Sequence, residues 1–188
     1  IAFSSALSGT YNSERFAAQE LAEKYPDSKI YVVDSLCASL GQGLLIDYAV
    51  RMKLEGKDID AVHTWLEENK GFVCHNFTVD DLFHLQAAAI FGSMLNVKPV
   101  LHVDDEGRLI PIAKVRGRKQ SLNALVDNME KQLGSFQGKN PRVFISHGDC
   151  EEDAQYVADR VKERCGVQAF LINYIGPVIG AHAGPGTV

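Results

Sequence analysis

The sequence predicts an α/β fold, and three observations support this prediction. Short β-branched or apolar runs alternate with amphipathic helix patterns along the whole chain, as is typical of α/β domains. The length of 188 residues suits one medium domain or two small ones, and 46% apolar with 23% charged residues is the composition of a chain that buries a core. We expect residues 1–70 to form a lobe with a parallel sheet, and residues 71–188 to form an α/β lobe with a mixed sheet.

The chain opens on an apolar strand end, Ile1-Ala2-Phe3, which runs into hydroxyl residues around Gly9 and then into a helix pattern. A helix start carries unpaired N–H groups and the positive end of the helix dipole, so this layout is typical of an anion site. The hydroxyl residues that can turn toward such an anion are Ser4, Ser5, Ser8 and Thr10. A helix cap followed by a turn explains the same residues, and local chemistry alone leaves both interpretations open.

The rest of the first lobe is predicted from its periodicity. A helix is expected over residues 12–25, and its buried stripe would consist of Phe16, Ala17, Leu21 and Ala22. The β-branched run 29–33 predicts a buried parallel strand. A helix follows over residues 38–54, and Asp58 caps another that ends near residue 69.

The second lobe continues the alternation. In chain order we expect a strand over 71–77, helices over 80–85 and 87–95, strands over 97–103 and 108–114, a helix over 121–133, a polar connector over 134–141, a strand over 142–146, a helix over 149–164 and a strand over 168–173. The turn Asp104-Asp105-Glu106-Gly107 is typical of an antiparallel hairpin. Asp149 and Glu152 have the spacing of a helix cap.

Charge and cysteine content exclude several functions. The net charge of −5 gives no general electrostatic reason to bind nucleic acid or an anionic membrane. No apolar run reaches the roughly 20 residues of a membrane span. The four cysteines, Cys37, Cys74, Cys150 and Cys165, have neither the spacing of a zinc site nor that of a disulfide framework. We therefore expect reduced thiols in a cytoplasmic protein without a metal or cofactor.

Two stretches at opposite ends of the chain carry a family resemblance. Ser4-Ser5-Ala6-Leu7-Ser8-Gly9-Thr10-Tyr11 and Gly176-Pro177-Val178-Ile179-Gly180-Ala181-His182-Ala183-Gly184-Pro185-Gly186-Thr187 resemble the signatures of the DegV family, bacterial fatty-acid-binding proteins. The motifs between them agree in order: Val33-Asp34-Ser35, Thr78-Val79-Asp80-Asp81-Leu82, Val97-Lys98-Pro99-Val100-Leu101 and Val115-Arg116-Gly117-Arg118-Lys119. The resemblance thus covers nearly the whole chain.

The resemblance implies a DegV-like fold of two lobes, of which the first is incomplete in this sequence. Members of the family begin with a further leading segment and continue briefly past the last motif. They also carry a segment of the kind Gly-Gly-Arg-Ile between the positions of Gln86 and Ala87, which this chain lacks. A true deletion and a mobile loop left out of the sequence both explain that difference, and we favour the second.

The resemblance also implies the residues that hold the ligand. Ser5 is expected to donate a hydrogen bond to a fatty-acid carboxylate, with Ser4 as the alternative because successive side chains of an extended backbone point to opposite sides. His182 is expected to be the second polar partner. The other histidines, His63, His75, His84, His102 and His147, are interpreted as surface or core residues.

The acyl tail needs a long apolar site, because a saturated chain of roughly C16–C18 gains about 0.8 kcal/mol per buried methylene. The candidate walls, each of which could equally be ordinary core, are Phe91, Met94, Leu95, Leu101, Ile110, Ile112 and Ile179. The family delivers its fatty acid to a separate kinase that forms an acyl phosphate. Arg116, Arg118 and Lys119 are therefore candidates for contact with that kinase, or else a solvated basic face.

The predicted function is a carrier that binds one long-chain fatty acid and catalyses no reaction itself. One alternative is a serine hydrolase with Ser5 as nucleophile, His182 as base and Asp34 or Asp149 as the orienting carboxylate. Against it, Ser5 lies in no Gly-x-Ser-x-Gly elbow. A second alternative is a binder of a small phosphate ligand that uses the same helix start.

Overall fold

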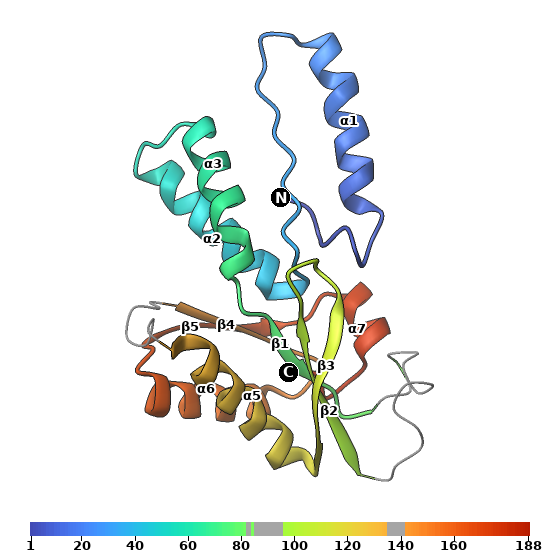
Figure 1. Cartoon of the computed structure of the whole chain (residues 1–188), viewed down its shortest axis with the longest axis vertical. Helices are drawn as coiled ribbons and strands as arrows, with labels where there is room; N and C mark the ends of the chain where they lie inside the picture. The colour runs from blue at the N-terminus through green and yellow to red at the C-terminus, as the bar shows by residue number, and fades with distance from the viewer. Residues whose placement is uncertain (82–83, 85–95, 135–141) are drawn as a thin grey trace. The chain divides into compact units, whose positions relative to one another are not determined.

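The computed structural model describes residues 1–81, 84, 96–134 and 142–188. The chain folds into two compact units (Figure 1). The first unit combines Ile1–Val73 with Val103–Arg108, and the second combines Cys74–His102 with Leu109–Val188. The tip of the predicted hairpin thus belongs to the first unit, which the sequence pattern does not indicate.

The first unit is built mainly from helices. These are α1 (Thr10–Lys24), α2 (Ser39–Leu54), α3 (Ile59–Asn69) and the 3-10 turn η1 (Lys70–Phe72). Asp58 caps α3 as predicted, because its side chain accepts a hydrogen bond from Ala61 N at 2.8 Å. α2 and α3 pack against each other around Val33, Leu45 and Leu66 (Figure 1).

The strand predicted over residues 29–33 is wrong. The parallel pairing is present, but only as an isolated bridge between Ala2 and Asp34. Ile30 and Tyr31 are 39% and 40% exposed. A strand needs a continuous ladder of backbone partners, and the described part of the first unit pairs only the last residues of this run with the N-terminal segment.

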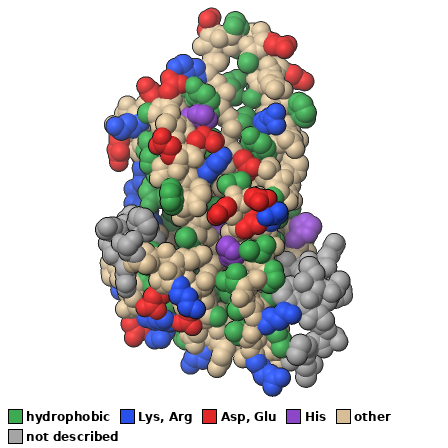
Figure 2. All heavy atoms as spheres, viewed as in Figure 1, with side chains coloured by type: hydrophobic (Ala, Val, Ile, Leu, Met, Phe, Trp, Pro, Cys, Tyr) green, Lys and Arg blue, Asp and Glu red, His purple; other side chains and the backbone are tan. Residues whose placement is uncertain are grey.

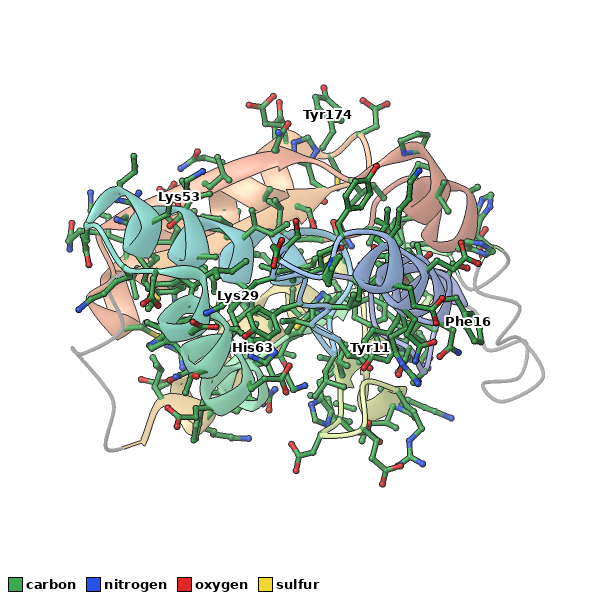
Figure 3. The ribbon with its side chains drawn as sticks, turned by 90° about the horizontal axis from the view of Figure 1, so that it is seen from above. Tyr11, Phe16, Lys29, Lys53, His63 and Tyr174 are labelled. Atoms are coloured by element: carbon green, nitrogen blue, oxygen red, sulfur yellow. The ribbon has the colours of Figure 1, made fainter. Side chains whose placement is uncertain are left out.

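The stripe predicted on the first helix is not buried. No residue of α1 is buried, and Phe16 is 65% exposed and projects from the helix (Figure 3). A helix buries its apolar stripe only where another element packs against it, and none among the described residues covers this one. Apolar side chains accordingly reach the molecular surface among charged ones (Figure 2).

The second unit holds two sheets, which confirm the predicted mixed α/β class. An antiparallel sheet has the order β1-β2-β3, with β1 at Asn76–Thr78, β2 at Val97–Val103 and β3 at Leu109–Arg116. β2 and β3 are joined by the predicted turn, which is closed by a bond from Asp104 N to Arg108 O at 2.9 Å. A parallel pair joins β4 (Arg142–His147) to β5 (Ala169–Tyr174), with Ile145 opposite Ile172.

Two long helices cover the sheets of this unit. α5 (Arg118–Leu133) contacts β1 and β3, α6 (Glu151–Cys165) contacts β4 and β5, and the two helices pack against each other (Figure 1). Val126 and Ala154 at their interface are fully buried. Because each fully buried Val or Leu contributes roughly 1.5–3 kcal/mol, this interface supplies much of the stability of the unit.

Several boundaries differ from the prediction. The strand expected over 71–77 is reduced to β1, because α3 continues into η1. The cap predicted at Asp149 and Glu152 is wrong, since α6 begins after Cys150 without a side-chain cap, and Asp149 has a φ of 54°. Of the helix predicted over 80–85, residues 80, 81 and 84 are described, and none of the three is helical. The helix predicted over 87–95 and most of the connector 134–141 fall on residues outside those described.

The half-buried His75 generates a prediction about pH. Burial lowers the pKa of His75 to about 4, from an ordinary value of 6.5. Between these values the unfolded chain binds more protons than the folded one, so the free energy of unfolding decreases as the pH falls from about 6.5 to about 4. Urea unfolding of wild type and His75→Gln at several pH values in this range measures the effect. We expect a shallower pH dependence in the variant, and equal slopes would rule out the contribution of His75.

Candidate functional site

A short backbone ladder positions the N-terminal hydroxyl residues. Ala2 N donates to Val33 O at 2.8 Å, Ser35 N to Ala2 O at 3.1 Å, and Ser4 N to Cys37 O at 2.9 Å. These bonds alternate between the two segments as in a parallel pair. The ladder therefore fixes Ser4 and the peptide that follows it against the loop after Asp34.

The carboxylate of Asp34 closes this arrangement. Its Oδ1 accepts hydrogen bonds from Ser5 N and Leu36 N, both at 3.1 Å, and the residue is only 8% exposed. Leu36 takes a left-handed conformation with a φ of 56° at this turn. Such Asp-to-backbone bonds two residues along the chain are the usual way in which an Asp stabilises a turn.

The two candidate serines have different environments. Ser4 is fully buried, and its hydroxyl donates to Gly107 O at 2.8 Å. Gly107 has a φ of +77°, and a Cβ there would lie 2.2 Å from Ser4 Oγ, so this approach requires glycine. Ser5 is exposed. The proton of Ser4 is thus already used inside the protein, whereas the structure presents the Ser5 side chain at the surface of its unit.

The start of α1 differs from the open anion site that the sequence suggested. Ser8 Oγ accepts from Thr10 N at 3.2 Å and pairs with Thr10 Oγ1 at 2.8 Å. Ser8 N and Leu7 N both donate to Ser4 O at 3.1 Å. Together with the bond from Ser5 to Asp34, these contacts occupy four backbone N–H groups of the loop. An anion here must rely on side-chain donors more than on the backbone.

His182 lies on a helix near the end of the chain. This helix, α7 (Pro177–Ala183), has Pro177 at its first position, where proline is favoured because its fixed φ suits a helix start. His182 occupies the last turn and is exposed. It belongs to the second unit, whereas Ser5 belongs to the first.

The basic residues after β3 are not equivalent. Arg118 binds Asp153 with Nε at 2.8 Å and Nη2 at 2.7 Å, which ties α5 to α6. Lys119 Nζ lies 5.8 Å from the centre of the Tyr156 ring. Arg116 is exposed. Arg118 therefore has a structural partner, and Arg116 is the member of the set best placed for a contact outside the chain.

The proposed tail residues divide between described and undescribed parts of the chain. Leu101 is buried on β2, Ile110 is half-buried and Ile112 is 40% exposed on the same face of β3, and Ile179 is half-buried on α7. Phe91, Met94 and Leu95 lie outside the described residues. The assignment of these seven side chains to a tail pocket therefore stays a prediction.

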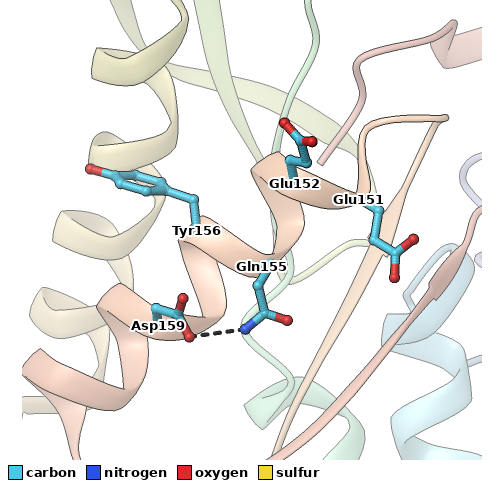
Figure 4. Close-up of a pocket in the computed structure, with 5 residues that line it drawn as sticks. All are labelled: Glu151, Glu152, Gln155, Tyr156 and Asp159. Carbon is cyan, nitrogen blue, oxygen red and sulfur yellow. Dashed lines mark hydrogen bonds between the residues drawn. The ribbon is translucent and has the colours of Figure 1, made fainter.

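An open depression of about 470 Å³ on α6 is unsuited to a fatty-acid head group. It is lined by Glu151, Glu152, Gln155, Tyr156 and Asp159 (Figure 4). Gln155 Nε2 donates to Asp159 Oδ1 at 2.9 Å. Three carboxylates around one hollow repel an anionic ligand.

Neither a metal site nor a membrane span is found in the described parts of the chain. Over these residues no three His, Cys, Asp or Glu side chains are grouped so that they could hold a metal ion. No described helix combines the length and the apolar character that crossing a membrane requires.

Comparison with known proteins establishes the family. The model of the DegV family, described as uncharacterised, matches residues 1–188. A DegV domain-containing protein of Clostridium perfringens is 50% identical over 195 aligned residues, which cover 100% of this chain and 66% of that protein. The chain therefore belongs to the DegV family, and it spans just under two thirds of that relative's length. At least seven of the 195 aligned positions have no residue in this chain.

Solved structures agree with this assignment. A Thermotoga maritima protein, described as revealing a fatty acid binding function, is 32% identical with a TM-score of 0.79, and the match covers 98% of this chain and 64% of that one. A stearic acid-binding protein from Eubacterium ventriosum is 27% identical with a TM-score of 0.83, covering 98% and 67%. The predicted DegV-like fold is thus confirmed.

The structure also shows roles that the sequence analysis missed. The sequence analysis gives Asp34 as part of a family motif and as the orienting carboxylate of the hydrolase alternative, whereas the structure shows it holding the backbone of the hydroxyl loop. The signal available in the sequence was an Asp followed by Ser directly after an apolar run, a pattern typical of side-chain-stabilised turns. The structural use of Ser4 depends on Gly107, which is 103 residues away. No local pattern could have indicated it.

The buried bond of Ser4 generates a stability prediction. Ser4→Ala leaves the carbonyl of Gly107 without this partner, so we expect the free energy of unfolding to fall by about 1–3 kcal/mol. Ser13→Ala is the matched control, because Ser13 also donates to a backbone carbonyl, that of Gly9, but from an exposed position. We expect the control to stay within about 0.5 kcal/mol of wild type. Urea unfolding followed by circular dichroism measures both, and equal midpoints for the two variants would contradict the assigned role of Ser4.

Proposed function

We propose that this chain is part of a carrier that binds one long-chain fatty acid. The observation that carries the proposal is that Ser4 and Ser5 have different roles. The Ser4 hydroxyl is bonded inside the protein, whereas Ser5 is exposed and its backbone N–H is bonded to Asp34. Membership of the DegV family and the likeness to proteins described as binding fatty acids support it.

In this proposal the Ser5 hydroxyl donates to the ligand carboxylate and His182 supplies a second donor. One donor is insufficient here, because Asp34 places a negative charge close to Ser5 and like charges oppose each other. The Ser5 N–H is already bound to Asp34, so the backbone at this residue cannot replace the hydroxyl. We therefore expect two side-chain donors, Ser5 and His182, to hold the ligand carboxylate beside Asp34.

The acyl tail is proposed to lie against apolar residues of the second unit. Ile110 and Ile112 on β3 and Ile179 on α7 are only partly buried, so each has surface left to contact a ligand. A tail of about C16–C18 contacting such residues gains roughly 0.8 kcal/mol for each methylene that leaves water. The expected ligand is therefore a long acyl chain with a free carboxylate.

The structure offers little support for the two alternatives. A hydrolase needs a carboxylate that orients the histidine, but Asp34 Oδ1 serves two backbone N–H groups and Asp149 is exposed. A phosphate binder of the helix-start type needs free backbone N–H groups, and the loop uses four of them internally.

The head-group assignment predicts opposite results for neighbouring serines. Mass spectrometry of the organic extract of the purified protein should find fatty acid near one mole per mole of chain in wild type. Ser5→Ala should lower the affinity for palmitate by about tenfold, as expected for loss of a hydrogen bond to a charged group. Ser4→Ala should lower stability while keeping the ligand.

The alternatives give distinct results in the same set of experiments. Labelling of Ser5 by a serine-reactive fluorophosphonate would favour the hydrolase. A wild-type protein that carries no lipid and binds none in titration would overturn the carrier proposal.

We further propose that the bound carboxylate is presented to a separate kinase, and that Arg116 contributes to this contact. Arg116→Glu should lower the rate of acyl phosphate formation, trapped as hydroxamate, by at least about tenfold, since it reverses the charge of an exposed contact residue. Lys57→Glu is the control, because it makes the same change of charge at another exposed position. Both variants should retain fatty acid. An unchanged rate with Arg116→Glu would remove this residue from the proposed interface.

A further inference from the structure

The chain that follows His182 is held by the side chain of Thr187. The hydroxyl of Thr187 lies 3.0 Å from Ala183 O and 2.9 Å from Gly184 O, so its single proton is shared between the two carbonyls. Both of these residues are buried. Carbonyls at a helix C-terminus have no partner within the helix, and buried ones need a donor from elsewhere. Thr187 therefore terminates α7 one residue after His182.

Thr187 is in turn fixed by the strand end and helix start beside it. Its carbonyl accepts from Gly148 N at 2.8 Å and from the Cys150 thiol at 3.3 Å. Gly186 N donates to Gly148 O at 2.7 Å, and Val188 exchanges two backbone bonds with Thr78, at 2.8 and 3.0 Å. These hydrogen bonds hold the backbone on both sides of Thr187 against β1 and the end of β4.

The thiol contact depends on the protonated form of Cys150. Burial raises the pKa of the Cys150 thiol, and the nearby charge of Arg118 opposes part of this increase. The thiol is therefore a donor to Thr187 O at neutral pH. Arg118 Nη2 approaches the sulfur at 3.6 Å while the same guanidinium is bound to Asp153. The contacts run without a break from α5 and α6 to the end of α7.

We propose that Thr187 is a positioning residue for His182, and that its hydroxyl sets the direction in which the imidazole leaves α7. This inference rests on the proposed role of His182 in holding the fatty-acid carboxylate. His182 is exposed and lies on a helix of only seven residues, so its orientation depends on how the helix ends. Without the hydroxyl, the two carbonyls lose their donor and the last turn of α7 is free to unwind.

The test compares three variants of the intact protein. Thr187→Val keeps the side-chain shape and removes the hydroxyl, whereas Thr187→Ser keeps the hydroxyl. Thr78→Val is the matched control, because Thr78 is a fully buried threonine of the same unit that donates to Pro99 O at 2.7 Å. Both valine variants should lose similar stability, so a purely structural effect would appear in both.

The first readout is the ring resonance of His182 in the lipid-free protein, assigned with His182→Gln. We expect Thr187→Val to shift or broaden this resonance, and Thr187→Ser and Thr78→Val to leave it in place. An unchanged resonance in Thr187→Val would overturn the inference, whatever the ligand of the protein proves to be.

The second readout is palmitate affinity. Thr187→Val should bind about fivefold to tenfold more weakly, as expected for the loss of one hydrogen bond, and Thr187→Ser should restore binding. Equal losses of affinity in Thr187→Val and Thr78→Val would reduce Thr187 to a structural role. Failure of wild type to bind palmitate would reject the proposed function, while the ring resonance would still decide the positioning role.

Discussion

The carboxylate of Asp34, bonded to the backbone of both Ser5 and Leu36, is the interaction on which the polar loop of the first unit depends. It joins the N-terminal segment to the loop after the parallel bridge, and the backbone ladder between these two segments then sets which serine faces inward. The bond of the Ser4 hydroxyl to Gly107 O buries Ser4, and the chain turns directly after it, where Ser5 is exposed. A single carboxylate thereby connects folding of this segment to its proposed binding chemistry.

In the second unit, close backbone contacts hold the end of the chain in place. The glycine-rich stretch at this end allows close approach of the chain to itself. A Cβ on Gly148 would lie 2.7 Å from Gly184 O, and Gly186 has a φ of +76° with Asp80 against it. The small residues therefore allow residues 184–188 to pack between β1 and β4. The same packing places the helix that carries His182.

These two arrangements explain why several adjacent hydroxyls suit a binding protein better than a hydrolase. A nucleophilic serine needs one base directed at it and a strained turn that exposes it. In this loop the hydroxyls of Ser4, Ser8 and Thr10 make hydrogen bonds to the backbone or to each other, and Ser5 does not have a positive φ. The loop is held by internal hydrogen bonds, and the Ser5 hydroxyl is exposed. Such a loop can orient a ligand without reacting with it.

The sequence alone determined the elements whose signals are local. Helices over α2, α3, α5 and α6, the hairpin of β2 and β3, and the cap at Asp58 follow from periodicity, turn residues and capping chemistry within a few positions. The family followed from ordered motifs along the chain, and Ser5 and His182 were candidates for the same reason. Errors arose where the outcome depended on distant partners. The run 29–33 has strand composition without a complete ladder, and α1 has an amphipathic stripe that no described element covers.

Only the tertiary structure decided which of the two serines is used for folding, because the bond that buries Ser4 comes from Gly107 in the hairpin turn. It also separated Arg118, paired with Asp153, from Arg116, and it placed Thr187 on the last carbonyls of α7. In each case residue type specified what a side chain can donate or accept, whereas the fold specified which partner lies within about 3 Å of it.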